Sequence, residues 1–196
     1  MARASVTRQE QKEMTRSGLI QTATHLFAKK GIATTATADV AKAQRVSHGT
    51  VFVHFPTRDD LILAVIDEFG AKLAQEFGDC PKQTDLQSLL EFHLDVLADY
   101  EDFYYRLVSE ISQLPPKVKS LAFMLNAAIS WKLFETCKPL MEKGEIKKMS
   151  RPQLFNTWIA LVHYHVQNRE LLSEKLPILK EKKRELIDHF LMLIRA

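Results

Sequence analysis

Apolar residues recur at helical spacing along almost the whole chain, and this periodicity restricts the fold more than any other feature. Leu19, Ala23 and Phe27 mark one face of an early helix, and Gly31 follows where that helix would end. Several later patterns begin with a proline in the first turn, where its missing N–H costs no hydrogen bond. No segment alternates in the manner of a strand. The sequence therefore predicts an all-α protein.

Glycine, proline and short polar segments divide the helical pattern. With the capping residues Ser47 and Thr57 included, the expected helices cover residues 7–30, 37–44, 47–55, 57–78, 86–97, 103–111, 116–137, 152–168 and 177–195. We expect two domains. Residues 1–56 would form a three-helix head, and residues 57–196 would form a helical bundle.

Positive charge is concentrated near the N-terminus, although the net charge of the chain is only +3. Residues 1–58 contain nine Lys or Arg and three Asp or Glu, so the remainder carries a net charge of −3. A basic block on a mildly acidic protein suggests that this end meets a polyanion. The two cysteines, Cys80 and Cys137, lack ligand-spaced neighbours, so we expect neither a disulfide framework nor a metal site.

Signals for export, membrane insertion and catalysis are missing from the sequence. Residues 1–12 lack the apolar core of a signal peptide, and no later run is long enough to span a membrane, so a cytoplasmic location is expected. There is no H-E-x-x-H motif, phosphate-binding glycine loop or nucleophile elbow. His163 and His165 are two residues apart, so on a helix they would point to nearly opposite sides. We expect no enzyme activity and no cofactor.

Two short helical segments around Val46 have the form of a helix-turn-helix. Residues 37–44 would form a supporting helix, and residues 47–55 would form a second helix short enough to lie in a DNA major groove. Val40 and Val51 are placed to pack the two helices together. The other faces of the second helix would carry mostly hydrogen-bonding side chains, so the sequence predicts a DNA-reading head.

The segments 26–31, 34–42 and 46–61 together resemble the TetR (tetracycline repressor) family. The resemblance covers roughly residues 8–70, and the rest of the chain is similar only in helical layout and length. It implies a dimeric transcriptional repressor that a small effector releases from a palindromic operator. A helical protein that binds a ligand and docks its basic head on an acidic protein partner is the alternative interpretation.

The resemblance also implies which residues meet double-stranded DNA. The predicted contacts are Thr37, Ala38, Ser47, His48, Thr50, Val51, Phe52, His54 and Arg58. Thr37, Ala38 and Arg58 would lie near phosphates, which position the protein on the duplex. His48 and Thr50 are the candidates for base contacts.

Three residues depart from the family pattern. Arg45 stands where the family usually has a turn glycine, so the turn must avoid a positive φ or tolerate strain of about 1–2 kcal/mol. Phe52 replaces a common Tyr and removes a hydroxyl that could bind a phosphate. Ala38 replaces a longer polar residue, which weakens the case for base contacts from the supporting helix.

The second domain is rich in aromatic residues that could line a cavity between helices, although most would serve as ordinary core. The resemblance implies an effector site here, and the composition favours a hydrophobic or aromatic small ligand. The candidate ligand-binding residues are Phe92, His93, Leu97, Tyr100, Phe103, Tyr104, Met124, Leu125, Trp131 and Trp158.

The last two long helical patterns carry apolar stripes that could be intramolecular core. Two such helices from each subunit would also form the four-helix interface of a homodimer, which the resemblance implies. The candidate interface residues are Leu154, Trp158, Leu161, Val162, His165, Leu179, Leu186, Ile187, Phe190 and Ile194.

Overall fold

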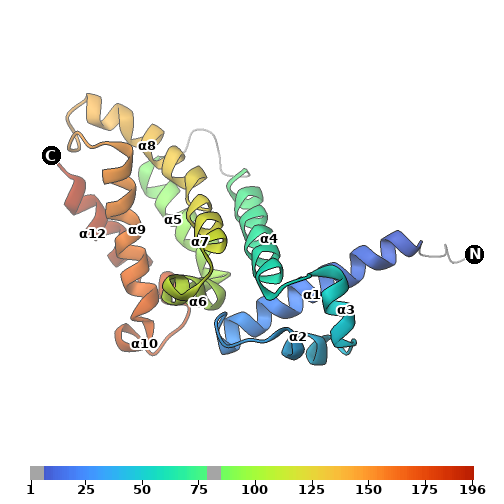
Figure 1. The fold of residues 1–196 in the computed structure, drawn as a ribbon. Coiled ribbons are helices and arrows are strands. Elements are labelled where there is room, and N and C mark those ends of the chain that lie inside the picture. The colour runs from blue at the N-terminus through green and yellow to red at the C-terminus, as the bar shows by residue number, and fades with distance from the viewer. Residues whose placement is uncertain (1–6, 79–84) are drawn as a thin grey trace, which may run out of the picture.

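The computed structural model describes residues 7–78 and 85–196, and the regular elements in these ranges are helices (Figure 1). Within the same ranges no strand forms, and Ile146 and Arg195 make a single isolated bridge. The all-α prediction is confirmed. Among the described helices, none combines the length and the apolar character that a membrane crossing requires.

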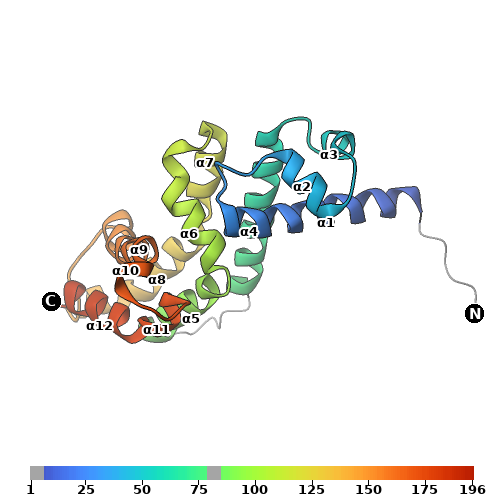
Figure 2. The ribbon, with the colours of Figure 1, turned by 90° about the horizontal axis from the view of Figure 1, so that it is seen from below.

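The N-terminal head consists of α1 (Arg8–Lys30), α2 (Thr37–Gln44) and α3 (His48–His54). Thr7 begins α1 with a capping box, in which its hydroxyl accepts from the Glu10 N–H and its own N–H bonds the Glu10 carboxylate. Side chains from all three helices meet in one buried cluster, which contains Leu19, Ala23, Phe27, Val40, Val51 and Phe55. Figures 1 and 2 show this head at one end of the molecule.

Helix α4 (Arg58–Gly78) connects the head to the rest of the protein. Its first turns bury Leu61 and Val65, and its later turns bury Phe69 and Leu73. The ring centroids of Phe69 and Phe103 lie 5.1 Å apart in an edge-to-face arrangement, which is a favourable geometry for an aromatic pair. The helix therefore packs against the head at one end and against the C-terminal body at the other (Figure 1).

The C-terminal body is a bundle in which one helix touches most of the others. Its elements are α5 (Leu86–Ala98), α6 (Glu101–Glu110), the 3-10 turn Ile111–Gln113, α7 (Pro116–Met124), α8 (Ala127–Glu142), α9 (Arg151–Gln167), α10 (Arg169–Leu172), α11 (Ile178–Glu181) and α12 (Lys183–Ile194). Helix α9 contacts α6, α8, α11 and α12. Its Trp158 is fully buried and is the largest side chain of the core.

Two of the expected helices are divided in the structure. The pattern at 116–137 forms α7 and α8, which are separated at Leu125 and Asn126, and α8 continues past Cys137 to Glu142. Leu125 packs against the α4 backbone at Gly70, where a Cβ atom would lie only 2.4 Å from the leucine side chain. This tertiary contact accompanies the break, whereas the periodicity of the segment alone indicated one helix.

The second divided helix is the expected segment at 177–195, which forms α11 and α12 on either side of Lys182. The buried Glu101 carboxylate accepts hydrogen bonds from the N–H groups of Ile178 (3.0 Å) and Leu179 (2.9 Å). A side chain distant in sequence thus satisfies the first turn of α11, and a local pattern does not reveal such a cap.

Candidate functional site

The turn between α2 and α3 has a left-handed residue at its centre. Arg45 has φ 59° and ψ 38°, and the next N–H, that of Val46, bonds the Ala41 carbonyl at 3.0 Å. The chain therefore keeps the turn geometry that a glycine would favour and accepts strain of about 1–2 kcal/mol at Arg45. The turn fixes how α3 leaves α2.

Helix α3 turns one face into the head and the other into solvent. Ser47 caps the helix, and its hydroxyl accepts from the Thr50 N–H at 3.1 Å. On the outer face, Phe52 is 43% exposed and Val53 is 72% exposed. Val51 is fully buried, so its side chain belongs to the core of the head and does not reach the outer face.

His48 and Thr37 connect the two helices of the motif. The Thr37 hydroxyl and His48 Nε2 are 2.9 Å apart, and the His48 ring packs edge-on against Phe52 at 4.7 Å. Thr37 is itself buried, whereas Ala38 and His48 are exposed. These contacts hold His48 in place on the outer face.

A groove between the start of α1 and α3 adds residues that sequence reasoning did not assign to the contact surface. Its lining includes the newly found Arg8, Lys12 and Val53, together with the predicted contacts Thr50 and His54. Burial, followed by the nearby charges of Lys12 and Arg16, lowers the pKa of His54. His54 is therefore mainly neutral at pH 7, and the positive charge of this groove comes from α1. The basic residues ahead of the first apolar stripe were the available sequence signal.

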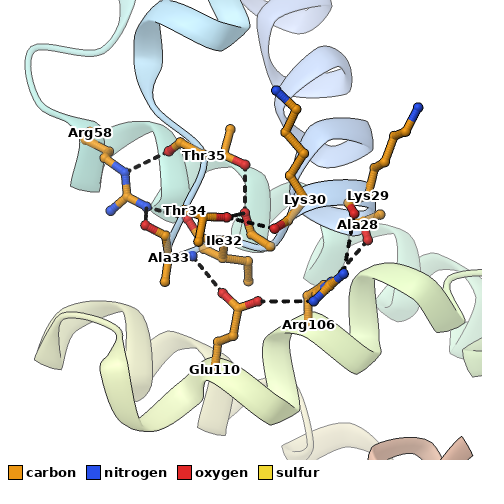
Figure 3. A network of polar contacts seen from close by, with 11 residues as sticks. Ala28, Lys29, Lys30, Ile32, Ala33, Thr34, Thr35, Arg58, Arg106 and Glu110 are labelled. Atoms are coloured by element: carbon orange, nitrogen blue, oxygen red, sulfur yellow. Dashed lines mark hydrogen bonds and ion pairs between the residues drawn. The ribbon is translucent and has the colours of Figure 1, made fainter. Parts of the chain in front are cut away.

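Arg58 lies differently from the other predicted contacts. Its guanidinium donates hydrogen bonds to the carbonyls of Thr35 (3.0 Å), Ala33 (3.1 Å) and Ile32, all in the loop between α1 and α2 (Figure 3). The sequence interpretation placed Arg58 at a phosphate. The structure places it against three backbone carbonyls of its own chain, where it positions the loop.

The same loop is also held from the body by α6 (Figure 3). The Glu110 carboxylate accepts from the Ala33 N–H at 2.6 Å, and the Arg106 guanidinium donates to the Ala28 carbonyl at 3.3 Å. Gly31, with φ 104°, permits the close approach, because a Cβ atom there would lie 2.6 Å from a Glu110 oxygen. We call Arg106 and Glu110, with the backbone groups that they bind, the α6–head contact.

The other face of α6 borders a cavity of about 390 Å³ inside the body. The cavity is lined by Leu73, Phe77, His93, Leu97, Tyr104, Leu107, Val108, Ile111, Lys119, Ala122, Phe123, Leu125, Asn126, Ile129, His163 and Gln167. The structure thus gathers residues of α4, α5, α6, α7, α8 and α9 around one mainly apolar space.

Four of the ten predicted ligand residues line this cavity: His93, Leu97, Tyr104 and Leu125. The remaining six, Phe92, Tyr100, Phe103, Met124, Trp131 and Trp158, are not part of its lining. Trp131 is 57% exposed and lies under the Arg151 guanidinium. Sequence periodicity placed aromatic residues in the bundle, but it did not separate those facing the cavity from those in the core.

Two buried polar pairs stand at the cavity wall. The Tyr104 hydroxyl and His163 Nε2 are 2.9 Å apart, and the Trp158 indole N–H donates to His93 Nδ1 at 2.9 Å. Burial, with a smaller contribution from His163, lowers the pKa of His93 to about 3. Burial also lowers the pKa of His163 and raises that of the Tyr104 hydroxyl. All three side chains are therefore mainly uncharged at pH 7. No cluster of three or more metal-binding side chains occurs in the part of the chain that the structure describes.

The residues predicted for a subunit interface lie inside the single chain. All of them except Leu161 are buried, and they form the core between α9, α12 and the rest of the body. The outer faces of the same two helices carry other apolar side chains. Tyr164 is 55% exposed on α9, and Met192 and Leu193 are 65% and 40% exposed on α12.

Comparison with known proteins finds a family match over the helix-turn-helix region. Residues 19–65 match the model of the bacterial regulatory proteins of the tetR family. The HTH-type transcriptional repressor Rv3405c of Mycobacterium tuberculosis is 38% identical over 87 residues, which are 44% of this chain and 46% of that protein. The aligned region therefore spans about half the length of this curated relative. The uncharacterized HTH-type transcriptional regulator YvkB of Bacillus subtilis is 22% identical over 86% of this chain and 90% of its own.

Solved structures share the whole fold. A transcriptional regulator of Saccharomonospora viridis in complex with choline has a TM-score of 0.75 and 17% identity, with 94% of this chain and 99% of that chain covered. FadR of Bacillus subtilis in complex with stearoyl-CoA has a TM-score of 0.73 and 14% identity, with 91% and 99% covered. The helix-turn-helix region therefore matches the tetR family of bacterial regulatory proteins, and the whole chain shares its fold with these two regulators.

Proposed function

We propose that this protein is a sequence-specific transcriptional repressor that binds a palindromic DNA operator as a homodimer and is released by a small, mainly apolar effector. The observation that carries the proposal is the outer face of α3. A capped helix of seven residues presents His48 and Phe52 to solvent at the end of a head that bears basic side chains. A helix of this size fits the major groove, where side chains can distinguish all four base pairs.

A repressor of this kind needs two heads. The outer faces of α9 and α12, with Tyr164, Met192 and Leu193, supply exposed apolar surface on adjacent helices. Pairing with the same helices of a second copy would form a four-helix interface with two-fold symmetry. The two α3 helices would then meet successive major grooves about 34–36 Å apart.

Effector control would pass through α6 and α4, because both helices border the cavity and both contact the head. On α6, Tyr104, Leu107 and Val108 line the cavity, while Arg106 binds the last turn of α1 and Glu110 binds the loop that follows. A ligand that prefers a displaced α6 would thereby change the orientation of the head. Release requires that the ligand bind the two orientations with unequal affinity. The choline and stearoyl-CoA complexes of the related folds support a ligand role for the body.

Selection of bound duplexes from a random DNA pool, at two salt concentrations, tests this function. The proposal predicts enrichment of an inverted repeat, with affinity that falls as salt rises because phosphate contacts release counterions. Binding without sequence preference would contradict the repressor proposal. Absence of DNA binding even at low salt would favour a basic head that docks an acidic protein partner.

A further inference from the structure

The hydrogen bond between Trp158 and His93 fixes the tautomer of the histidine. The indole nitrogen of Trp158 is only a donor, so His93 Nδ1, at 2.9 Å, must be the acceptor and carries no proton. The low pKa of His93, about 3, means that the ring is neutral at pH 7. A neutral ring with an unprotonated Nδ1 carries its proton on Nε2. Nε2 of His93 is therefore a hydrogen-bond donor.

Among the described residues, the donor of His93 has no hydrogen-bond partner, and His93 borders the cavity. His93 is 2% exposed and is part of the cavity lining. Within residues 7–78 and 85–196, Nε2 of His93 makes no hydrogen bond. The fully enclosed polar atoms without a partner in these ranges are His54 Nδ1 and Arg169 Nε, so Nε2 of His93 is not fully enclosed. The open space that Nε2 meets is accordingly the cavity, and a buried donor is stabilised by an acceptor there.

The rest of the lining restricts the occupant further. In the other polar pair, the Tyr104 hydroxyl and His163 Nε2 lie 2.9 Å apart, so this bond uses one of the two donors that the pair carries. Lys119, the one cationic side chain among the described lining residues, donates to the Ser112 carbonyl at 2.7 Å. None of the described lining residues is acidic. Most of the wall is apolar, so a charged ligand would lose hydration with little compensation.

We propose that the cavity takes an uncharged, mainly apolar molecule with one acceptor oxygen, such as a ketone, and that His93 Nε2–H donates to that oxygen. This inference rests on the proposed function in one respect only, which is that the bound molecule acts as the effector. Recognition through a donor separates ketones from hydrocarbons of the same shape, because the hydrocarbon would leave the His93 donor without a partner.

Fluorescence of Trp158 provides the test. The sequence contains two tryptophans, and Trp131→Phe removes the exposed one outside the cavity, which leaves Trp158 as the reporter beside His93. In this background we would titrate benzophenone, the hydrocarbon diphenylmethane, in which CH2 replaces the carbonyl group, and the anion diphenylacetate. The expected result is benzophenone binding about fivefold tighter than diphenylmethane, the fold-change that one net hydrogen bond provides, with diphenylacetate the weakest.

Two substitutions at His93 separate the donor from the shape of the site. His93→Phe removes the donor, so the preference for benzophenone should disappear. His93→Gln can accept from Trp158 and still donate to the cavity, so the preference should remain. An unchanged preference in His93→Phe, tightest binding of diphenylacetate, or no saturable binding of either neutral probe would overturn the proposal.

NMR of the unsubstituted protein tests the same proposal if a His93 variant does not fold. In protein labelled with 15N-histidine, the NMR signals of His93 should show a proton on Nε2, and benzophenone should shift the Nε2 resonance. A proton on Nδ1 would overturn the assignment. DNA selection is measured separately, so failure of this ligand class and failure of the repressor function give different results.

Discussion

Glu110 in the body and Ala33 in the head are joined by a hydrogen bond of 2.6 Å between the glutamate carboxylate and the alanine backbone N–H. A bond from a charged side chain to backbone is stronger than one between neutral groups, and it fixes the end of α1 relative to α6. The same helix borders the cavity through Tyr104 and Leu107. This bond therefore connects a helix of the cavity wall to the head.

Removal of that bond should weaken the response to ligand. We predict that Glu110→Ala reduces the effector-induced loss of DNA affinity by about 0.5–2 kcal/mol, the usual size of coupling carried by one residue. Fluorescence anisotropy of labelled operator, with and without ligand, measures the change. Glu142→Ala, at an exposed carboxylate of α8, is the control and should respond as the wild type does. A wild-type response in Glu110→Ala would exclude the α6–head contact from the coupling.

Gly31 should be intolerant of a side chain. Its φ of 104° is a conformation that L-residues rarely adopt, and a Cβ would lie 2.6 Å from a Glu110 oxygen. We expect Gly31→Ala to lower the free energy of unfolding by about 1–3 kcal/mol, measured by urea denaturation. Gly78→Ala is the matched control, because it lies at the end of a helix with no atom within 4 Å of the added Cβ. Equal stability of the two variants would show that the loop relaxes without cost.

Arg45→Gly should raise stability. The left-handed backbone at φ 59° destabilises an arginine by about 1–2 kcal/mol, and glycine removes this strain. Glycine also loses more backbone entropy on folding, which offsets part of the stabilisation. The expected net increase in the free energy of unfolding is up to about 1 kcal/mol. Lys42→Gly, on the helical backbone of α2, should lower it by about 1 kcal/mol instead. A loss of stability in both variants would indicate that the Arg45 side chain makes a compensating contact.

His93 should make the protein less stable in acid. Its pKa in the folded protein is about 3, well below the ordinary value of 6.5, so the unfolded chain binds more protons between these values. The His93 contribution to stability is fully present above pH 6.5 and is lost as pH falls toward 3. We predict that wild type loses about 1.4 kcal/mol more than His93→Gln between pH 7.5 and pH 5.5. Urea denaturation at the two pH values measures this difference, and parallel losses in both proteins would contradict it.

The sequence was sufficient to predict the helices of the head, because α1 and α3 begin at the capping residues Thr7 and Ser47 and are followed by Gly31 and Pro56. Within the body, periodicity identified apolar stripes but not the element that covers each one. Trp158 and Phe190 accordingly appeared as interface candidates, yet both are fully buried by their own chain. The same limit applies to Arg58, whose carbonyl partners are brought to it by a loop more than twenty residues earlier. Such long-range contacts leave no periodic signal in the sequence.

The most direct test of the central claim, that the outer face of α3 reads DNA, is the affinity of wild type and His48→Ala for the selected operator and for its single-base variants. We predict that His48→Ala loses about 1–3 kcal/mol on the operator and no longer discriminates at one base position, while Lys12→Ala weakens binding to all sequences equally. An equal loss for His48→Ala across every sequence would contradict the claim.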